Sequence, residues 1–228
     1  MPPTAETITF QGETATLPGY LARPEGDGPF PAVVVIHEIF GLNEQIRDVA
    51  RRCAVEGYVA LAVDLFGRRN RALCMLRFFS GMRSNSLDHV GIRDLKAALT
   101  FLAEQPGVDS ERLGAIGFCM GGSFAVAWAC ADNRLKVIAP YYAMNPRPFE
   151  AVKRSCPVVG SYPGKDFTTA HGQKLDVALE QYEIKHDIKV YPGAKHSFFN
   201  DQRPRSYDAA TSDDSWKRVL AFFQEQIG

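Results

Sequence analysis

The chain has 228 residues, and its 26 basic and 26 acidic side chains give a formal charge of zero. A neutral chain has no global positive field, which disfavours nucleic acid or an anionic membrane surface as a partner. Its apolar share of 46% is that of a globular protein, and its longest apolar run, residues 124–131, is far shorter than the roughly 20 residues of a membrane-spanning helix.

The predicted strands begin with an antiparallel pair near the N-terminus. Residues 6–10 and 14–21 flank a short turn, which is the pattern of a hairpin at a sheet edge. From residue 32 onward, short apolar runs rich in β-branched residues alternate with stretches of helical period. These runs predict strands buried on both faces. They cover residues 32–36, 58–63, 113–118, 136–142, 157–161 and 188–191.

The stretches between the strands predict amphipathic helices. Their apolar stripes run through Ile46, Val49, Ala50 and Cys53, through Ile92, Leu95, Leu99 and Leu102, and through Trp216, Val219, Leu220, Phe223 and Ile227. The alternation of strand and helix predicts an α/β fold with a mostly parallel central sheet and helices on both faces. Because no repeat or linker interrupts this pattern, we expect a single domain over residues 1–228.

One segment, residues 66–88, breaks the alternation. It carries five arginines and one acid, Asp88, interleaved with apolar side chains. Two interpretations are open: a solvated amphipathic connector, or a basic flap over a pocket that takes an anionic substrate. In the second interpretation Arg77 is a candidate for contact with the substrate.

The most specific motif is Gly-Phe-Cys-Met-Gly-Gly at residues 117–122. It directly follows a predicted strand and opens an apolar helix predicted over residues 123–131. This is the pattern of a nucleophile elbow with Cys119 in place of serine, in which the tight turn requires glycine at Gly117 and Gly121. The helix N-terminus is expected to favour the thiolate. The alternative is that Cys119 is a small buried apolar residue.

Two further loops supply candidates for an acid and a base. Asp166 follows the strand at 157–161, and His196 follows the strand at 188–191. The chain order Cys119, Asp166, His196 is the order of nucleophile, acid and histidine in α/β-hydrolases. Asp166 could instead be a turn or N-cap residue, in which case Asp201 is the next candidate for the acid.

The loop after the strand at 32–36 completes the predicted site. An oxyanion hole on this fold takes one amide from the residue after the nucleophile, Met120, and a second from this loop, where Ile39 can supply it. Glu38 is either a solvated loop acid or a carboxylate that holds or deprotonates the thiol.

With these motifs in order, the sequence resembles the dienelactone hydrolase (carboxymethylenebutenolidase) family of α/β-hydrolases. The similarity runs from about residue 14 to the C-terminus and is sharpest at residues 38–41, 117–122 and 193–198. The resemblance implies the α/β-hydrolase fold and hydrolysis of a small-molecule ester or lactone without a metal or an organic cofactor. It also implies a Cys-Asp-His triad at Cys119, Asp166 and His196, a contact of Glu38 with the thiol, and an oxyanion hole at Ile39 and Met120.

The sequence departs from this family where substrate is bound. The family places an arginine shortly after the His-Ser-Phe triplet, whereas this chain has Asn200 there, with Arg203 and Arg205 close by. The arginines of residues 66–88 do not fall in the family's register. These departures leave undecided whether dienelactone itself is the substrate. The candidates for substrate binding are Arg77, Phe198 and Arg203.

We therefore predict a hydrolase that cleaves a lactone or carboxylic ester through a cysteine nucleophile and a thioester acyl-enzyme. The alternatives are a general carboxylesterase or thioesterase, and a non-catalytic thiol-sensing protein on the same fold. The five cysteines lack the paired short spacings of a zinc site, and Met1–Phe10 has no signal-peptide pattern. These features predict free thiols in the cytoplasm.

Overall fold

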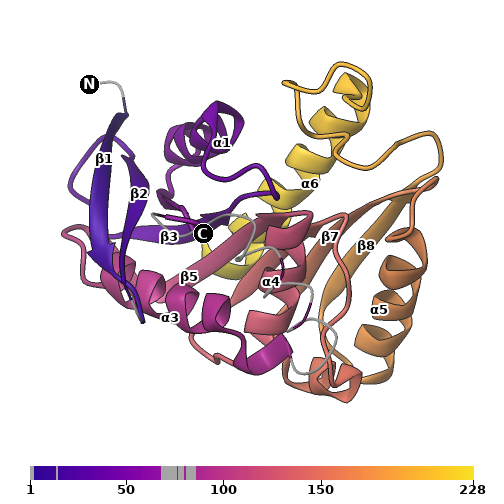
Figure 1. Ribbon diagram of the computed structural model, residues 1–228. Coiled ribbons are helices and arrows are strands. Elements are labelled where there is room, and N and C mark those ends of the chain that lie inside the picture. The colour runs from indigo at the N-terminus through magenta and orange to yellow at the C-terminus, as the bar shows by residue number, and fades with distance from the viewer. Residues whose placement is uncertain (1–2, 14, 68–75, 77–79, 81–85) are drawn as a thin grey trace.

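The computed structural model of this protein describes residues 3–13, 15–67, 76, 80 and 86–228. Its centre is an eight-stranded sheet with the strand order β1-β2-β4-β3-β5-β6-β7-β8 (Figure 1). The strands are β1 (Thr4–Gln11), β2 (Thr16–Arg23), β3 (Phe30–Ile36), β4 (Val59–Val63), β5 (Val108–Phe118), β6 (Val137–Tyr141), β7 (Val158–Pro163) and β8 (His186–Tyr191).

The sheet is antiparallel only at its N-terminal edge. β1 pairs antiparallel with β2, and β2 pairs antiparallel with β4, whereas all pairs from β4 to β8 are parallel. Every residue of β4 and of β6 is buried, as strands covered on both faces require. The structure thus confirms the predicted hairpin at the edge and the mostly parallel sheet.

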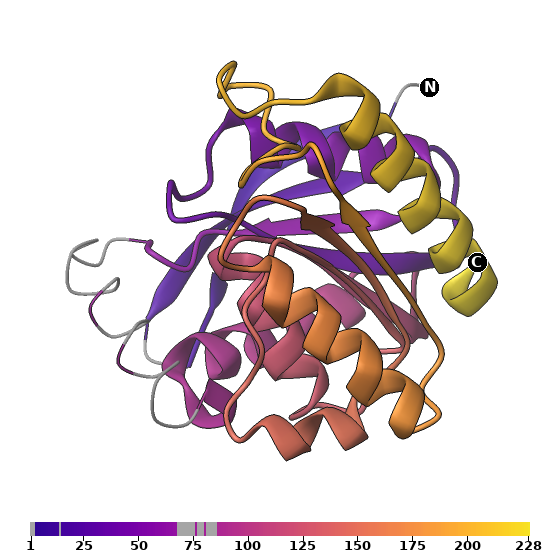
Figure 2. The same ribbon diagram turned by 90° about the vertical axis from the view of Figure 1, so that its right-hand side faces the viewer.

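Helices cover both faces of this sheet (Figure 1). α1 (Glu44–Val55) and α6 (Ala209–Ile227) lie on one face, and α3 (Val90–Ala103), α4 (Met120–Ala129) and α5 (Thr169–Gln181) lie on the other. Figure 2 shows α6 in yellow and α5 in orange on opposite sides of the strands. No helix in the described part of the chain is long and apolar enough to cross a membrane.

Each face has its own apolar core because side chains alternate along a strand. In β3, Val34 and Ile36 pack into the core beneath α3, α4 and α5, whereas Val33 and Val35 pack beneath α1 and α6. The sheet is therefore a rigid layer held from both sides. The carboxyl ends of its parallel strands meet at one edge, where ligands bind in open α/β sheets.

One helix begins earlier than predicted. α4 begins at Met120 rather than at residue 123, because Gly121 and Gly122 are held in the helix by close packing on the strand ends. A Cβ atom on Gly121 would lie 2.3 Å from the Ile36 carbonyl oxygen, and one on Gly122 would lie 2.7 Å from that of Tyr141.

Candidate active site

The turn between β5 and α4 places Cys119 in a strained backbone conformation. Its φ of 54° and ψ of −111° lie outside the regions that residues with a side chain normally adopt. A Cβ atom on Gly117 would lie only 2.2 Å from the Gly121 carbonyl oxygen. Glycine is therefore required beside the turn, which is the physical basis of the motif seen in the sequence.

Three side chains from separate loops form one hydrogen-bonded line at the carboxyl edge of the sheet. The His196 Nε2 atom lies 3.1 Å from the Cys119 Sγ atom, and its Nδ1 atom lies 2.7 Å from Asp166 Oδ2. Since Asp166 accepts the hydrogen bond from Nδ1, that nitrogen carries the proton and Nε2 is left to accept one from the thiol. The structure thus brings together the three residues that the sequence singled out.

Asp166 is held as a carboxylate by its neighbours. Burial alone would raise its pKa, but hydrogen bonds from Thr168 and His196 outweigh that effect, and the pKa is lowered. The Thr168 hydroxyl, which is fully buried, donates to the same oxygen as His196 at 2.5 Å. Thr168, not Asp166, is the N-cap residue of α5. The sequence contained no signal for this threonine.

The thiol of Cys119 is neutral in this environment. Burial and the negative charge of Glu38 raise its pKa to about 12, although the Met120 backbone amide acts in the opposite direction. The amide at the helix N-terminus does act to favour the thiolate, as expected, but loss of solvation and a nearby carboxylate outweigh it. A neutral thiol can still transfer its proton to the adjacent imidazole when it reacts.

Glu38 is buried, with 2% of its surface exposed, and is held by the loop that follows His196. Its Oε1 atom accepts a hydrogen bond from the Ser197 hydroxyl at 2.8 Å, and its Oε2 atom accepts one from the Asn200 side-chain amide at 2.7 Å. Both donors are neutral. The carboxylate oxygens are thus engaged by Ser197 and Asn200, and the effect of Glu38 on the thiol is through its charge.

Two aromatic rings flank the His196 imidazole. The buried ring of Tyr142 lies 5.0 Å from it, and the ring of Phe167, which is 64% exposed, stacks on it at 5.3 Å. Tyr142 has a φ of 40°, so it is a second strained residue at this edge. Burial and the charge of Glu38 raise the pKa of its hydroxyl well above the usual value. Sequence reasoning missed both rings.

The two amides proposed for the oxyanion hole lie in adjoining loops. Ile39 follows β3 and Met120 begins α4, and β3 and β5 are neighbours in the sheet. The elbow packs directly on the end of β3, since a Cβ atom on Gly121 would lie 2.7 Å from the His37 carbonyl oxygen. The fold therefore brings the elbow against the start of the loop that contains Ile39.

The three candidates for substrate binding differ in their placement. Phe198 is fully buried and packs among the rings of Tyr141, Tyr142 and Tyr191, so it is a core residue and the expectation that it contacts substrate is wrong. Arg203 is exposed, stacks 4.9 Å over the Phe40 ring and acts to lower the pKa of the Cys119 thiol. Arg77, with most of residues 66–88, lies outside the described residues.

Comparison with known proteins gives consistent matches over nearly the whole chain. The profile of the dienelactone hydrolase family matches residues 17–227. A relative from Escherichia coli (strain K12), assigned as a carboxymethylenebutenolidase, is 35% identical, with 97% of this chain and 86% of the relative covered.

Solved structures agree with these matches. The crystal structure of a protein assigned as a dienelactone hydrolase from Klebsiella pneumoniae is 30% identical, with a TM-score of 0.83 and 98% and 99% of the two chains covered. A dienelactone hydrolase-like promiscuous phosphotriesterase from metagenomic libraries is 25% identical, with a TM-score of 0.89 and both chains fully covered.

Proposed function

Since this chain belongs to the dienelactone hydrolase family and is an ester or lactone hydrolase, we propose that it cleaves its substrate through Cys119 as the nucleophile. The observation that supports this proposal is the line of hydrogen bonds from Cys119 through His196 to Asp166, at 3.1 and 2.7 Å. The strained backbone of Cys119 also supports this proposal, because strained residues cluster at functional sites.

Acylation begins with the neutral thiol. The Cys119 proton moves to His196 Nε2 as the sulfur attacks the carbonyl carbon of the ester or lactone. The tetrahedral oxyanion is stabilised by the amides of Met120 and Ile39. When it collapses, the bond from carbon to the alkoxide oxygen breaks, and the imidazolium gives its proton to that oxygen. The products are an alcohol and a thioester on Cys119.

Deacylation repeats these steps with water. His196 Nε2 takes a proton from the water as its oxygen attacks the thioester carbonyl, and the sulfur then leaves and recovers that proton. The carboxylate of Asp166 keeps the proton on Nδ1 and stabilises the imidazolium in both half-reactions. The overall reaction consumes one water and releases a carboxylic acid and an alcohol, which are joined in one molecule when the substrate is a lactone.

Glu38 and Arg203 are two charged residues near the thiol. Glu38 places a negative charge near the thiol, and both of its hydrogen-bond donors are neutral. Arg203 is an exposed cation close enough to the thiol to lower its pKa. We assign to Arg203 the attraction of an anionic group of the substrate. The test compares the rates at which the parent protein and Arg203→Gln hydrolyse lactones with and without a carboxylate.

An alkylation experiment separates a hydrolase from a thiol sensor. We expect turnover of an activated aryl ester to be lost when iodoacetamide modifies Cys119, as located by peptide mass spectrometry. The control is Cys156→Ala, which removes a partly buried thiol elsewhere and should leave turnover and its loss on alkylation unchanged. A protein that alkylates at Cys119 but hydrolyses no ester before or after treatment would be a sensor instead.

A further inference from the structure

A cavity at the carboxyl edge of the sheet has no role in the bond-making and bond-breaking steps proposed above. It lies between the loop that follows β6 and the first turns of α5, has a volume of about 470 Å³, and includes Asn145, Arg147, Phe149, His171 and Lys174 in its wall. Tyr142 at the start of this loop packs on His196, and α5 begins three residues after Asp166. The cavity is therefore adjacent in the chain to two elements of the candidate active site.

His171 presents a hydrogen-bond donor in this cavity. Its Nδ1 atom accepts a hydrogen bond from the Asn145 backbone amide at 3.1 Å, and its carbonyl accepts one from the Asn145 side chain at 3.0 Å. Because Nδ1 is an acceptor, the neutral ring carries its proton on Nε2. Burial and the charges of Lys174 and Arg147 lower the pKa of His171, which favours the neutral ring. Within the described residues, Nε2 has no hydrogen-bond partner.

Two cations complete the wall. Both Arg147 and Lys174 act electrostatically on His171, and Lys174 Nζ lies 4.1 Å from the centroid of the Phe149 ring. Among the described residues neither cation makes an ion pair, and the described wall of the cavity contains no acidic side chain. The Asn145 Oδ1 atom is buried without a hydrogen-bond partner. The site thus offers three positively polarised donor groups and one spare acceptor.

We propose that this cavity binds the carboxylate of a small organic acid. A carboxylate accepts hydrogen bonds from a guanidinium, an ammonium and an imidazole N–H at once, and charge-assisted bonds of this kind are the strong ones. The Phe149 ring provides an apolar wall for a short carbon chain, and the volume admits a small molecule only. The carboxylate has two sources: a distal group of the substrate, or a free acid such as the product of hydrolysis.

Binding is tested without turnover, so the test does not depend on the proposed function. Butyrate and its neutral analogue butyramide are titrated into the intact protein, and the ¹⁵N shifts of the His171 ring are followed by NMR. We expect saturable shifts with butyrate only. The double variant Arg147→Gln/Lys174→Gln should raise the Kd about tenfold or more. The matched control Lys153→Gln removes an exposed lysine outside this cavity and should leave the Kd unchanged.

Equal shifts with butyramide, no shift with butyrate, or an unchanged Kd in the double variant would overturn the proposal. Kinetics then distinguish the two sources. If the double variant raises KM about tenfold for an aryl ester with a terminal carboxylate and not for aryl butyrate, the ligand is the substrate's own group. If free butyrate alters hydrolysis of a neutral ester in the parent protein and not in the double variant, the ligand is a free acid.

Discussion

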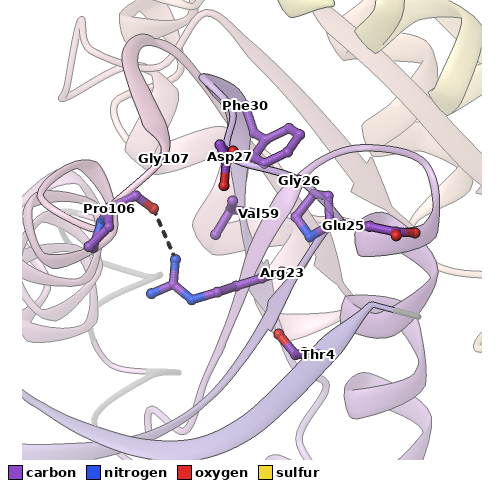
Figure 3. Close-up of a pocket in the computed structure, with 10 residues that line it drawn as sticks. Thr4, Arg23, Glu25, Gly26, Asp27, Phe30, Val59, Pro106 and Gly107 are labelled. Atoms are coloured by element: carbon purple, nitrogen blue, oxygen red, sulfur yellow. Dashed lines mark hydrogen bonds between the residues drawn. The ribbon is translucent and has the colours of Figure 1, made fainter. Parts of the chain in front are cut away.

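The two edges of the sheet each carry a cavity, but they differ in chemistry. At the amino edge, a cavity of about 560 Å³ lies against Arg23, Asp27, Phe30, Val59 and Gly107 (Figure 3). Its arginine is used internally: the Arg23 guanidinium donates to the Pro106 carbonyl at 3.2 Å and to the Gln105 side chain at 2.7 Å. These bonds join β2 to the turn before β5.

The carboxyl edge holds strained backbone and a chain of charged and polar groups. Of the four non-glycine residues described with positive φ, three lie here: Cys119, Tyr142 and Ser197. The buried carboxylate of Glu38 and the line from Cys119 to Asp166 lie here as well. The comparison teaches that cavity volume alone does not mark a functional site, whereas strain together with unsolvated polar groups does.

The largest expected effect is a loss of activity on substitution of Cys119 at the carboxyl edge. Cys119→Ala removes the proposed nucleophile and should lower kcat for an activated ester by about 10⁶-fold, by analogy with serine hydrolases. Its thermal midpoint should stay close to that of the parent, because a methyl group fits where the thiol was. An alanine variant with more than a tenth of the parent activity would place the nucleophile elsewhere.

The second-largest loss of activity is expected on substitution of the acid, Asp166. Asp166→Asn leaves the shape of the side chain but removes the charge that fixes the His196 tautomer, so kcat should fall by up to about 10⁴-fold. Asp201→Asn, in an exposed residue that the sequence left as an alternative acid, serves as the matched control and should retain activity. The opposite pattern, with Asp166→Asn active and Asp201→Asn inactive, would move the acid to Asp201.

Glu38 offers a test in which the sign of the effect matters. If its charge raises the pKa of the thiol, Glu38→Gln lowers that pKa and increases the thiolate fraction at every pH below about 12. A fall of one unit would make alkylation by iodoacetamide about tenfold faster at pH 8. Glu44→Gln, in an exposed residue of α1, should have no effect. Slower alkylation in Glu38→Gln would instead identify Glu38 as a base for the thiol.

The smallest effect is expected at the amino edge. Arg23→Gln removes the bonds to Pro106 and Gln105 and should lower the thermal midpoint by about 2–4 °C, as expected for a loss of about 1 kcal/mol in a chain of this length. Turnover should be unchanged within about twofold. A large loss of activity without a loss of stability would show that the amino edge also takes part in function.

The fold and the three-residue line were predictable because their signals are local. Short runs rich in β-branched residues predict buried strands, and the elbow requires glycine at fixed positions beside Cys119. Asp166 and His196 could be placed because each directly follows a predicted strand, and parallel strands end at one edge.

What the sequence did not reveal depends on contacts between distant residues. Glu38 is bonded to Ser197 and Asn200, 159 and 162 positions away, and nothing in the local pattern indicates that pairing. The raised pKa of Cys119 comes from burial and from Glu38, both products of packing, which outweigh the effect of the helix terminus that the local sequence indicates. Phe198 was a candidate for substrate binding, although its side chain is fully buried in the core.

The central claim is that the Cys119 sulfur carries the acyl group during turnover. The most direct measurement is to mix the protein with an activated aryl ester, quench within the first turnover in acid, and locate the acyl mass by peptide mass spectrometry. We predict a thioester on the peptide containing Cys119, formed at the rate of the first product burst and absent in Cys119→Ala. An acyl group on another side chain, or full turnover by Cys119→Ala, would contradict this account.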